Sequence, residues 1–117
     1  MLATNIQRGI PPSLRGMIWQ MFSKSKDPVL ESQYRDFLRR DSPYDKMIQR
    51  DLARTFPDHQ FFKDPDGQGQ VGLYNVVKAY SIYDEEVGYC QGIAFIVGAL
   101  LLNVSTLSFL ASICRFW

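Results

Sequence analysis

The sequence contains few of the residues on which disulfide and metal chemistry depend. Its 117 residues include two cysteines and one histidine, and Cys90 and Cys114 are far from the short spacing of a metal motif. We therefore predict no metal site. The apolar neighbours of both cysteines favour packed, reduced thiols in a cytoplasmic setting. The beginning of the chain also lacks the basic and then apolar pattern of a signal peptide.

The sequence also lacks an excess of charge of either sign. The chain has 13 Lys and Arg against 12 Asp and Glu, a net charge of +1, and acids alternate with bases from Lys24 to Asp66. Because no basic stripe is available to follow a phosphate backbone, nucleic acid is not an expected partner. Hydrophobic residues make up 46% of the chain, which is typical of an ordinary globular domain.

The alternating pattern of a half-buried strand is also absent, whereas apolar residues recur at helical spacing, so the expected fold is all-α. In the third expected helix, Ser42 caps the start and Asp45 reaches back toward the cap. This helix ends near Phe56, because Pro57 disfavours helix at the residue before it. The expected helices cover residues 11–22, 29–40, 42–56 and 71–83.

A long stretch without charge lies between Glu86 and Arg115. Residues 95–113 are long enough for a membrane span. Their centre, "NVSTLS", is polar and favours a turn between two shorter apolar segments. Membrane association or self-association through 95–113 is therefore kept as an alternative.

Three familiar patterns have ordinary explanations here. "GQGQVG" at 67–72 fits the dinucleotide fingerprint but follows no strand, and "DPDG" at 64–67 begins a calcium-loop pattern whose twelfth position is Asn75 rather than Glu. We interpret both as a mobile turn. His59 and Cys90 are the residue types of a base and a nucleophile, but a surface histidine and a packed cysteine are the favoured interpretation.

The segment "IQRDLARTFP" contains Arg54, which helical spacing places with Met47 and Asp51 on one face. Ile48, Leu52 and Thr55 fall on an adjacent apolar face. An aspartate three residues before Arg54 can pair with it and hold its guanidinium in one rotamer. Taken alone, the pattern favours a surface ion pair worth at most about 1 kcal/mol.

Three motifs in order give the sequence a family resemblance. They are "RGIPPSLRGMIW", with Arg8, Gly9, Pro11, Arg15 and Trp19; "IQRDLAR", with Ile48, Asp51 and Arg54; and "YCQG", with Tyr89, Gln91 and Gly92. Together they resemble the TBC domain of Rab GTPase-activating proteins. The resemblance covers about residues 6–102, whereas 103–117 differ from the family pattern.

The resemblance implies that Arg54 and Gln91 are catalytic residues, supplied in trans to a Rab-type GTPase in vesicle trafficking. Asp51 would orient Arg54, with Tyr89 and Gly92 in supporting positions. The partner would carry GTP and Mg²⁺, so the chain needs no cofactor of its own. In the first motif, Arg15 is expected to bond to nearby chain ends and Trp19 to fill a helix contact.

TBC domains contain a second helical half, so residues 1–117 are expected to form a partial TBC domain. The expected setting is cytoplasmic and peripheral to endomembranes. The alternative is a non-catalytic GTPase-binding or regulatory fragment. Without the second half, an open apolar surface is expected at Phe95, Ile96, Leu100, Phe109 and Phe116.

Overall fold

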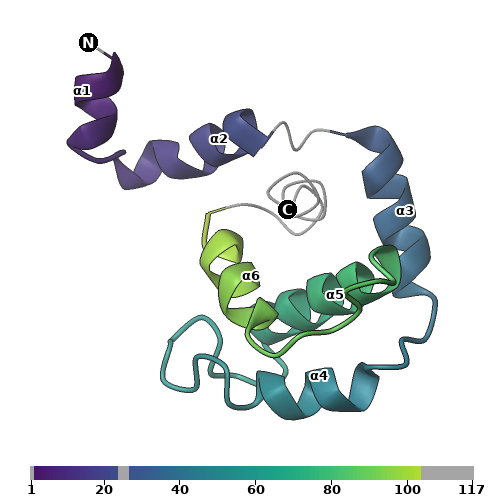
Figure 1. Cartoon of the computed structure of the whole chain (residues 1–117). Coiled ribbons are helices and arrows are strands. Elements are labelled where there is room, and N and C mark those ends of the chain that lie inside the picture. The colour runs from purple at the N-terminus through teal and green to yellow at the C-terminus, as the bar shows by residue number, and fades with distance from the viewer. Residues whose placement is uncertain (1, 24–26, 104–117) are drawn as a thin grey trace.

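A computed structural model of the chain describes residues 2–23 and 27–103 (Figure 1). Within these ranges the protein has six helices and no strand, which confirms the all-α prediction. The helices are α1 (Leu2–Gln7), α2 (Pro12–Ser23), α3 (Pro28–Leu38), α4 (Asp45–Leu52), α5 (Gln68–Tyr83) and α6 (Ile93–Leu101). The sequence predicted helices near α2 to α5, but it gave no expectation of α1.

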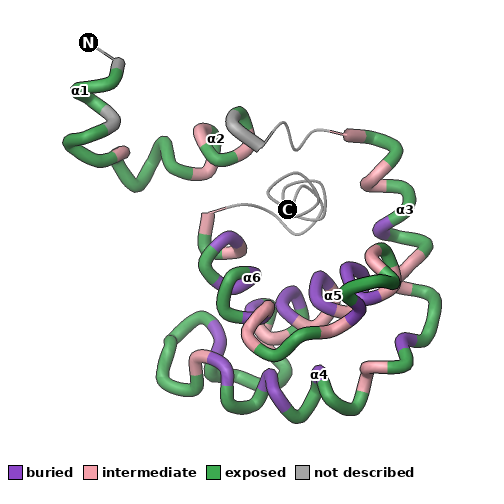
Figure 2. Tube along the Cα trace, viewed as in Figure 1, coloured by how far each residue is buried: buried purple, intermediate pink, exposed green. Residues whose placement is uncertain are grey.

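Helix α5 is the centre of the packed part of the molecule. It contacts α3, α4 and α6, and Figure 1 shows it surrounded by these three helices. Figure 2 shows most of the buried chain on α5 and on the surfaces that face it. Leu73, Val76 and Ala79 of α5 are fully buried, as are Ile48 of α4 and Val97 of α6. The core therefore depends on one central helix with partners on several sides.

Helices α1 and α2 lie apart from this core in Figure 1. Helix α2 approaches the end of α6, because a Cβ added at Gly16 would lie 2.4 Å from the carbonyl oxygen of Asn103. The side chain of Arg15 donates from Nε to the carbonyl oxygen of Ile10 at 2.9 Å, which confirms the expected bond to nearby chain. Trp19 is 36% exposed, so its indole is only partly covered.

The third predicted helix begins at Asp45, three residues later than expected, with Tyr44 rather than Ser42 at its N-cap, and the side chain of Tyr44 makes no capping hydrogen bond. The expected bonds between Ser42 and the residues that follow it are nevertheless present. The hydroxyl of Ser42 accepts the backbone N–H of Tyr44 at 3.2 Å, and a carboxylate oxygen of Asp45 accepts the N–H of Ser42 at 3.4 Å. These reciprocal bonds satisfy two amide groups of the turn at residues 42–44, which leads into α4. Ser42 also shares a 2.7 Å hydrogen bond with the hydroxyl of Ser81, so the start of α4 is tied to α5.

The end of this helix differs from the prediction. Helix α4 ends at Leu52 rather than near Phe56. The N–H of Arg54 donates to the carbonyl of Asp51 three residues back, and the hydroxyl of Thr55 donates to the same carbonyl at 2.7 Å. This carbonyl is therefore occupied by a tighter turn. Phe56 then adopts a left-handed backbone with φ of 51°, so the chain leaves the helix before Pro57 is reached.

The interpretation of "GQGQVG" as a turn is wrong for most of its length. Residues 64–67 do form a turn, in which the carbonyl of Asp64 accepts the N–H of Gly67 at 3.1 Å. From Gln68 onward the motif belongs to α5. Its second glycine, Gly69, is buried against the backbone of Phe61, where an added Cβ would lie 2.1 Å from the carbonyl oxygen. Close packing therefore explains this glycine.

Two further expectations concern His59 and Cys90. His59 is an exposed surface residue, as expected, and its Nδ1 accepts the N–H of Phe61 at 3.1 Å. The prediction of a packed Cys90 is wrong, because this residue is exposed in the connection between α5 and α6. The apolar neighbours that favoured burial, Ile93 and Ala94, belong to α6 and turn toward the core after the cysteine. Cys114 lies outside the described residues.

The apolar stretch 95–113 is only partly within the described chain. Helix α6 ends at Leu101, and no helix in the described ranges is long and apolar enough to cross a membrane. Phe95 and Ile96 are exposed as expected, whereas Leu100 is buried at 8% exposure against the core, which corrects the expectation for that residue. The predicted turn "NVSTLS" lies outside the described residues except for Asn103. Phe109 and Phe116 also lie outside them.

Candidate functional site

The carboxylate of Asp51 is the meeting point of the two sequence motifs that follow the N-terminal one. It lies in the last turn of α4, and its side chain is only 7% exposed. The guanidinium of Arg54 donates to Oδ1, and the hydroxyl of Tyr89 donates to Oδ2 at 2.6 Å. A third group, Nε of Arg50, lies 3.6 Å from Oδ1. One carboxylate thus joins residues 38 positions apart in the chain.

This position of Asp51 corrects the predicted face of the helix. Asp51 is buried on the side of Ile48 and Leu52, while Met47 remains exposed at 44%. A residue three positions after Ile48 and adjacent to Leu52 falls at the edge of their apolar face. Arg50 was expected to face solvent or a partner. Its side chain is 68% exposed, yet it also contributes to the charge around Asp51.

The bonds around Asp51 fix the protonation of both partners. The hydrogen bond from Tyr89 is the largest cause that lowers the pKa of Asp51 below its ordinary value, with a smaller contribution from Arg54, against an opposing effect of burial. Burial, followed by the bond to Asp51, raises the pKa of Tyr89. At neutral pH the aspartate is therefore charged and the tyrosine hydroxyl is a donor.

Arg54 is held at one side and open at the other. It lies in the turn after α4, and its side chain is 58% exposed although its guanidinium donates to Asp51. A guanidinium carries five N–H donors in a rigid plane. The bond to Asp51 fixes the direction of this plane, while the exposed part of the side chain faces solvent. The arrangement presents a permanent, oriented cation at the surface.

Gln91 lies in the connection between α5 and α6, which is braced along its length. Asp84 begins this connection, and its carbonyl accepts the N–H of Gly88 at 2.7 Å. Gly88 has a φ of 58° and packs against Tyr44, where an added Cβ would lie 2.6 Å from the phenolic oxygen. Gly92, with a φ of 100°, precedes the first residue of α6. Both glycines thus adopt a left-handed backbone that residues with a Cβ rarely take.

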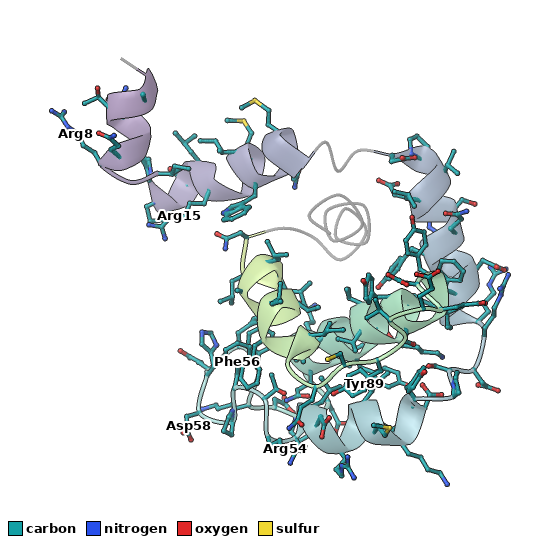
Figure 3. The ribbon with its side chains drawn as sticks, in the orientation of Figure 1. Arg8, Arg15, Arg54, Phe56, Asp58 and Tyr89 are labelled. Carbon is teal, nitrogen blue, oxygen red and sulfur yellow. The ribbon has the colours of Figure 1, made fainter. Side chains whose placement is uncertain are left out.

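The side chain of Gln91 is exposed, as that of Arg54 is. Tyr89 precedes it by two residues and is held on α4 by Asp51. The glutamine connection is therefore attached to α4 and, through Asp51, to the arginine turn, residues 53–55. Figure 3 shows Tyr89 above α4 and Arg54 at the end of the same helix. The sequence placed Tyr89 in a supporting role but carried no signal of this contact, because it depends on how α4 and α5 pack.

The N-terminal motif lies away from Asp51. Figure 3 shows Arg8 and Arg15 on the α1–α2 arm, far along the molecule from Arg54 and Tyr89. Arg8 is exposed, and Gly9 has a φ of 92° in the connection between the two helices. Pro11 precedes the first residue of α2. Within the motif, Arg15 bonds to the carbonyl of Ile10 in its own arm, and Gly16 lies against Asn103 after α6.

The geometry of the described residues gives little support to a metal site, or to His59 and Cys90 acting together as a base and a nucleophile. Among residues 2–23 and 27–103, no group of three or more His, Cys, Asp or Glu side chains is placed to hold a metal ion. His59 accepts from the neighbouring backbone in the loop after α4, and Cys90 donates weakly to the carbonyl of Gln91 at 3.6 Å. The cluster around Asp51 is therefore the candidate site.

Comparison with known proteins shows the family to which the chain is similar. The sequence model of one family, described as the Rab-GTPase-TBC domain, matches residues 12–117. The human Ecotropic viral integration site 5 protein homolog is 48% identical over 99 residues, which cover 85% of this chain and 12% of the human protein. Rab GTPase-activating protein eat-17 of Caenorhabditis elegans is 50% identical over 99 residues, covering 85% of this chain and 11% of that protein.

A solved structure agrees with the sequence matches. The crystal structure of the Chlamydomonas flagellar RabGAP TBC domain is similar with a TM-score of 0.81 and 30% identity, over 97% of this chain and 41% of that one. This chain spans 11–12% of the length of the two relatives named above. The similarity thus covers nearly all of this chain and only a part of each relative.

Proposed function

Because the chain belongs to the Rab-GTPase-TBC domain family, we propose that it stimulates GTP hydrolysis by a Rab-type GTPase and supplies Arg54 and Gln91 in trans. Such an activator acts on the GTP and Mg²⁺ that its partner carries, so the chain itself supplies only side chains and a docking surface. The partner and the role in vesicle trafficking belong to the same proposal, as does a cytoplasmic setting.

The observation that carries the proposal is the arrangement of Arg54 on Asp51. GTP hydrolysis spreads negative charge over the transferring phosphoryl group, and a planar, permanently charged guanidinium can stabilise that charge. A guanidinium that is already oriented loses less conformational entropy when it enters a partner's site. The bond to a buried carboxylate, which Tyr89 holds in turn, supplies this orientation while the side chain stays 58% exposed.

Gln91 fits the second role in the same reaction. A side-chain amide can accept a hydrogen bond from the attacking water with its oxygen and donate one to a phosphoryl oxygen with its nitrogen. Gln91 is exposed, and the connection that carries it is fixed to α4 through Tyr89. We therefore assign stabilisation of the phosphoryl group's negative charge to Arg54, and orientation of the attacking water to Gln91.

Single-turnover GTP hydrolysis across a panel of Rab GTPases tests the proposal. We expect the wild-type chain to accelerate hydrolysis by one partner, and Arg54→Ala to remove most of an effect that for arginine fingers is about 10³ to 10⁵. Gln91→Ala is expected to lower the rate as well. Lys46→Ala is the matched control, because it removes an exposed cation from α4. Equal rates with all four proteins would refute catalysis.

The partial coverage of the domain favours one second candidate. Because the chain matches 41% of the crystallised TBC chain, it is also a candidate for a fragment that binds the GTPase without stimulating it. Binding of the GTP-loaded partner, measured by calorimetry beside the hydrolysis assay, separates the two functions. Binding without acceleration in the wild-type chain would identify the non-catalytic function.

A further inference from the structure

Phe56 has an unusual backbone directly after the arginine turn. Its φ of 51° is in the left-handed region, and it is the non-glycine residue with positive φ among those that the structure describes. A bulky side chain disfavours this region, so such a residue persists only where its surroundings hold it. Positions of this kind are frequent at functional sites. Phe56 follows Arg54 by two residues, which raises the question of what holds it.

The ring of Phe56 is held by aromatic contacts and by α6. It stacks on Phe62 with ring centroids 5.2 Å apart, and it meets Phe95 edge-on at 5.2 Å. It also lies against Gly98, where an added Cβ would be 2.4 Å from its Cε2 atom. Figure 3 shows Phe56 beside α6. The glycine therefore lets the ring approach the backbone of the helix closely.

The preceding residue is fixed to α4. Thr55 is buried, its hydroxyl donates to the carbonyl of Asp51 at 2.7 Å, and its N–H donates to the carbonyl of Leu52 at 3.1 Å. The arginine turn is thus attached to α4 through Thr55 and to α6 through Phe56. Arg54 lies between Leu52 and these two attachments.

Helix α6 also determines where Gln91 lies. It begins at Ile93, two residues after the glutamine, and Phe95 and Gly98 lie in its first two turns. A helix has a fixed rise and rotation per residue, so a contact to its early turns also locates the chain at its start. The contact of Phe56 is therefore a second link between the arginine and glutamine segments, separate from the bond between Tyr89 and Asp51.

We infer that Phe56 is a positioning residue, which sets the separation of Arg54 and Gln91 by locking the arginine turn onto α6. Its effect on the rate rests on the proposed function, because it acts through those two side chains. Its effect on geometry does not, and can be measured in the free chain. The prediction therefore has one measurement without a GTPase and one with it.

The geometric measurement uses the exposed thiol of Cys90, next to Gln91. A nitroxide attached there, in a Cys114→Ser background, broadens the amide NMR signals of the arginine turn according to their distance. We expect Phe56→Gly, which accepts positive φ but lacks the ring, to reduce and spread this broadening at Arg54 and Thr55. Phe95→Ala, which removes only the edge-on contact, should have a smaller effect in the same direction.

Ile96→Ala is the matched control for the geometry. Ile96 follows Phe95 in α6 and is similarly exposed, at 44% against 51%. We expect its broadening pattern to match that of the unmodified sequence. If Phe56→Gly fails to fold by circular dichroism, Phe95→Ala decides. An unchanged pattern in the folded variant would overturn the inference.

The functional measurement compares binding with rate, using unlabelled chains. A displacement of about 1 Å in a catalytic group can cost roughly a hundredfold in rate. We expect Phe56→Gly to lower the stimulated rate by about this factor while the Kd for the GTP-loaded partner is unchanged, and Ile96→Ala to leave the rate unchanged. A wild-type chain without stimulation would refute the proposed function, whereas full stimulation by Phe56→Gly would refute only the inference.

Discussion

At the scale of single residues, the burial of Asp51 changes the meaning of its pair with Arg54. The sequence alone favoured a surface ion pair, which contributes little to stability because water competes for both charges. In the structure only the arginine is exposed, whereas the carboxylate is 7% exposed and also accepts the hydroxyl of Tyr89. The pair therefore has one fixed member and one presented member.

The first prediction concerns Tyr89→Phe, which keeps the ring and removes the hydroxyl. The hydrogen bond from Tyr89 is the largest cause of the lowered pKa of Asp51, so we expect this pKa to rise toward its ordinary value of 3.8. An NMR titration of the Asp51 carboxyl carbon measures it. Stimulated hydrolysis should also fall, by up to about a hundredfold if the guanidinium moves by 1 Å.

Tyr74→Phe is the matched control for this variant. Its hydroxyl donates to Asp45 at 2.9 Å, so it removes the same type of bond at the opposite end of α4. The pKa of Asp51 should stay low in this control. If it rises equally in both variants, the effect belongs to the whole helix rather than to Tyr89.

The same shift gives stability a defined dependence on pH. A carboxyl whose folded pKa is below its unfolded value stabilises the fold fully above the unfolded value, about 3.8, and loses this contribution as pH falls through the folded pKa. The difference in unfolding free energy between wild type and Asp51→Asn should therefore be constant near neutral pH and shrink below about pH 3.8. Urea unfolding at several pH values measures this difference.

The second prediction is that Arg54→Lys restores little of the activity that Arg54→Ala removes. Lysine keeps the positive charge but offers a point cation on a flexible chain, without the planar set of donors that Asp51 can orient. Single-turnover hydrolysis measures the difference, and Arg35→Lys on the exposed side of α3 is the control. Recovery close to wild type would show that only the charge matters.

At the scale of helices, the sequence predicted bonds between near neighbours better than the bounds of α4. The bonds of Ser42 and Asp45 could be predicted because they connect residues two and three positions apart, although α4 begins at Asp45 rather than directly after Ser42. The end of α4 depends on Phe56, whose left-handed backbone is held by rings from other segments. A local pattern carries no record of such contacts, so the predicted helix continued about a turn beyond the observed end at Leu52.

The third prediction uses the glycine that resembled part of a nucleotide motif. In Gly69→Ala, the gain in helix propensity is about 1 kcal/mol. It is opposed by a Cβ placed 2.1 Å from the carbonyl oxygen of Phe61, a backbone atom that cannot rotate away. We expect the steric effect to be larger, with a net loss of about 1–3 kcal/mol or more in urea unfolding.

Gln68→Ala is the control for this variant, because it changes an exposed residue in the same first turn of α5. Its stability should stay close to that of the wild type. A Gly69→Ala protein more stable than the wild type would show that the loop around Phe61 relaxes at little cost.

At the scale of the whole molecule, the family and the all-α class followed from the sequence, and parts of the site did not. Arg54 and Gln91 could be proposed as site residues through the family resemblance, because the motifs that contain them are short and continuous. The junction at Asp51 was missed, since it joins segments 38 residues apart. Cys90 was expected inside because its neighbours in the sequence are apolar, yet those neighbours begin a helix that turns away from it.

The fourth prediction concerns the apolar surface of α6 and α2. Phe95 and Ile96 are exposed at 51% and 44%, and Met17 and Met21 of α2 are each exposed at 64%. Large exposed apolar patches promote association, so we expect light scattering to show a mass that rises with concentration. Phe95→Ser with Ile96→Ser should reduce this rise, whereas Val87→Ser, at an exposed position before α6, should not. A monodisperse monomer that binds no hydrophobic dye would contradict this prediction.

The bond between Tyr89 and Asp51 has a consequence for the order in which the site is assembled during synthesis. Arg54 leaves the ribosome well before Tyr89, and the carboxylate that orients it gains its second partner only when the later segment has folded back across α5. We expect nascent chains stalled with residue 89 still inside the ribosome to react at Arg54 with an arginine-specific reagent faster than chains stalled after it emerges. Equal reactivity would show that α4 orients the arginine alone. An oriented arginine thus reports that the chain has been built and folded beyond its central helix.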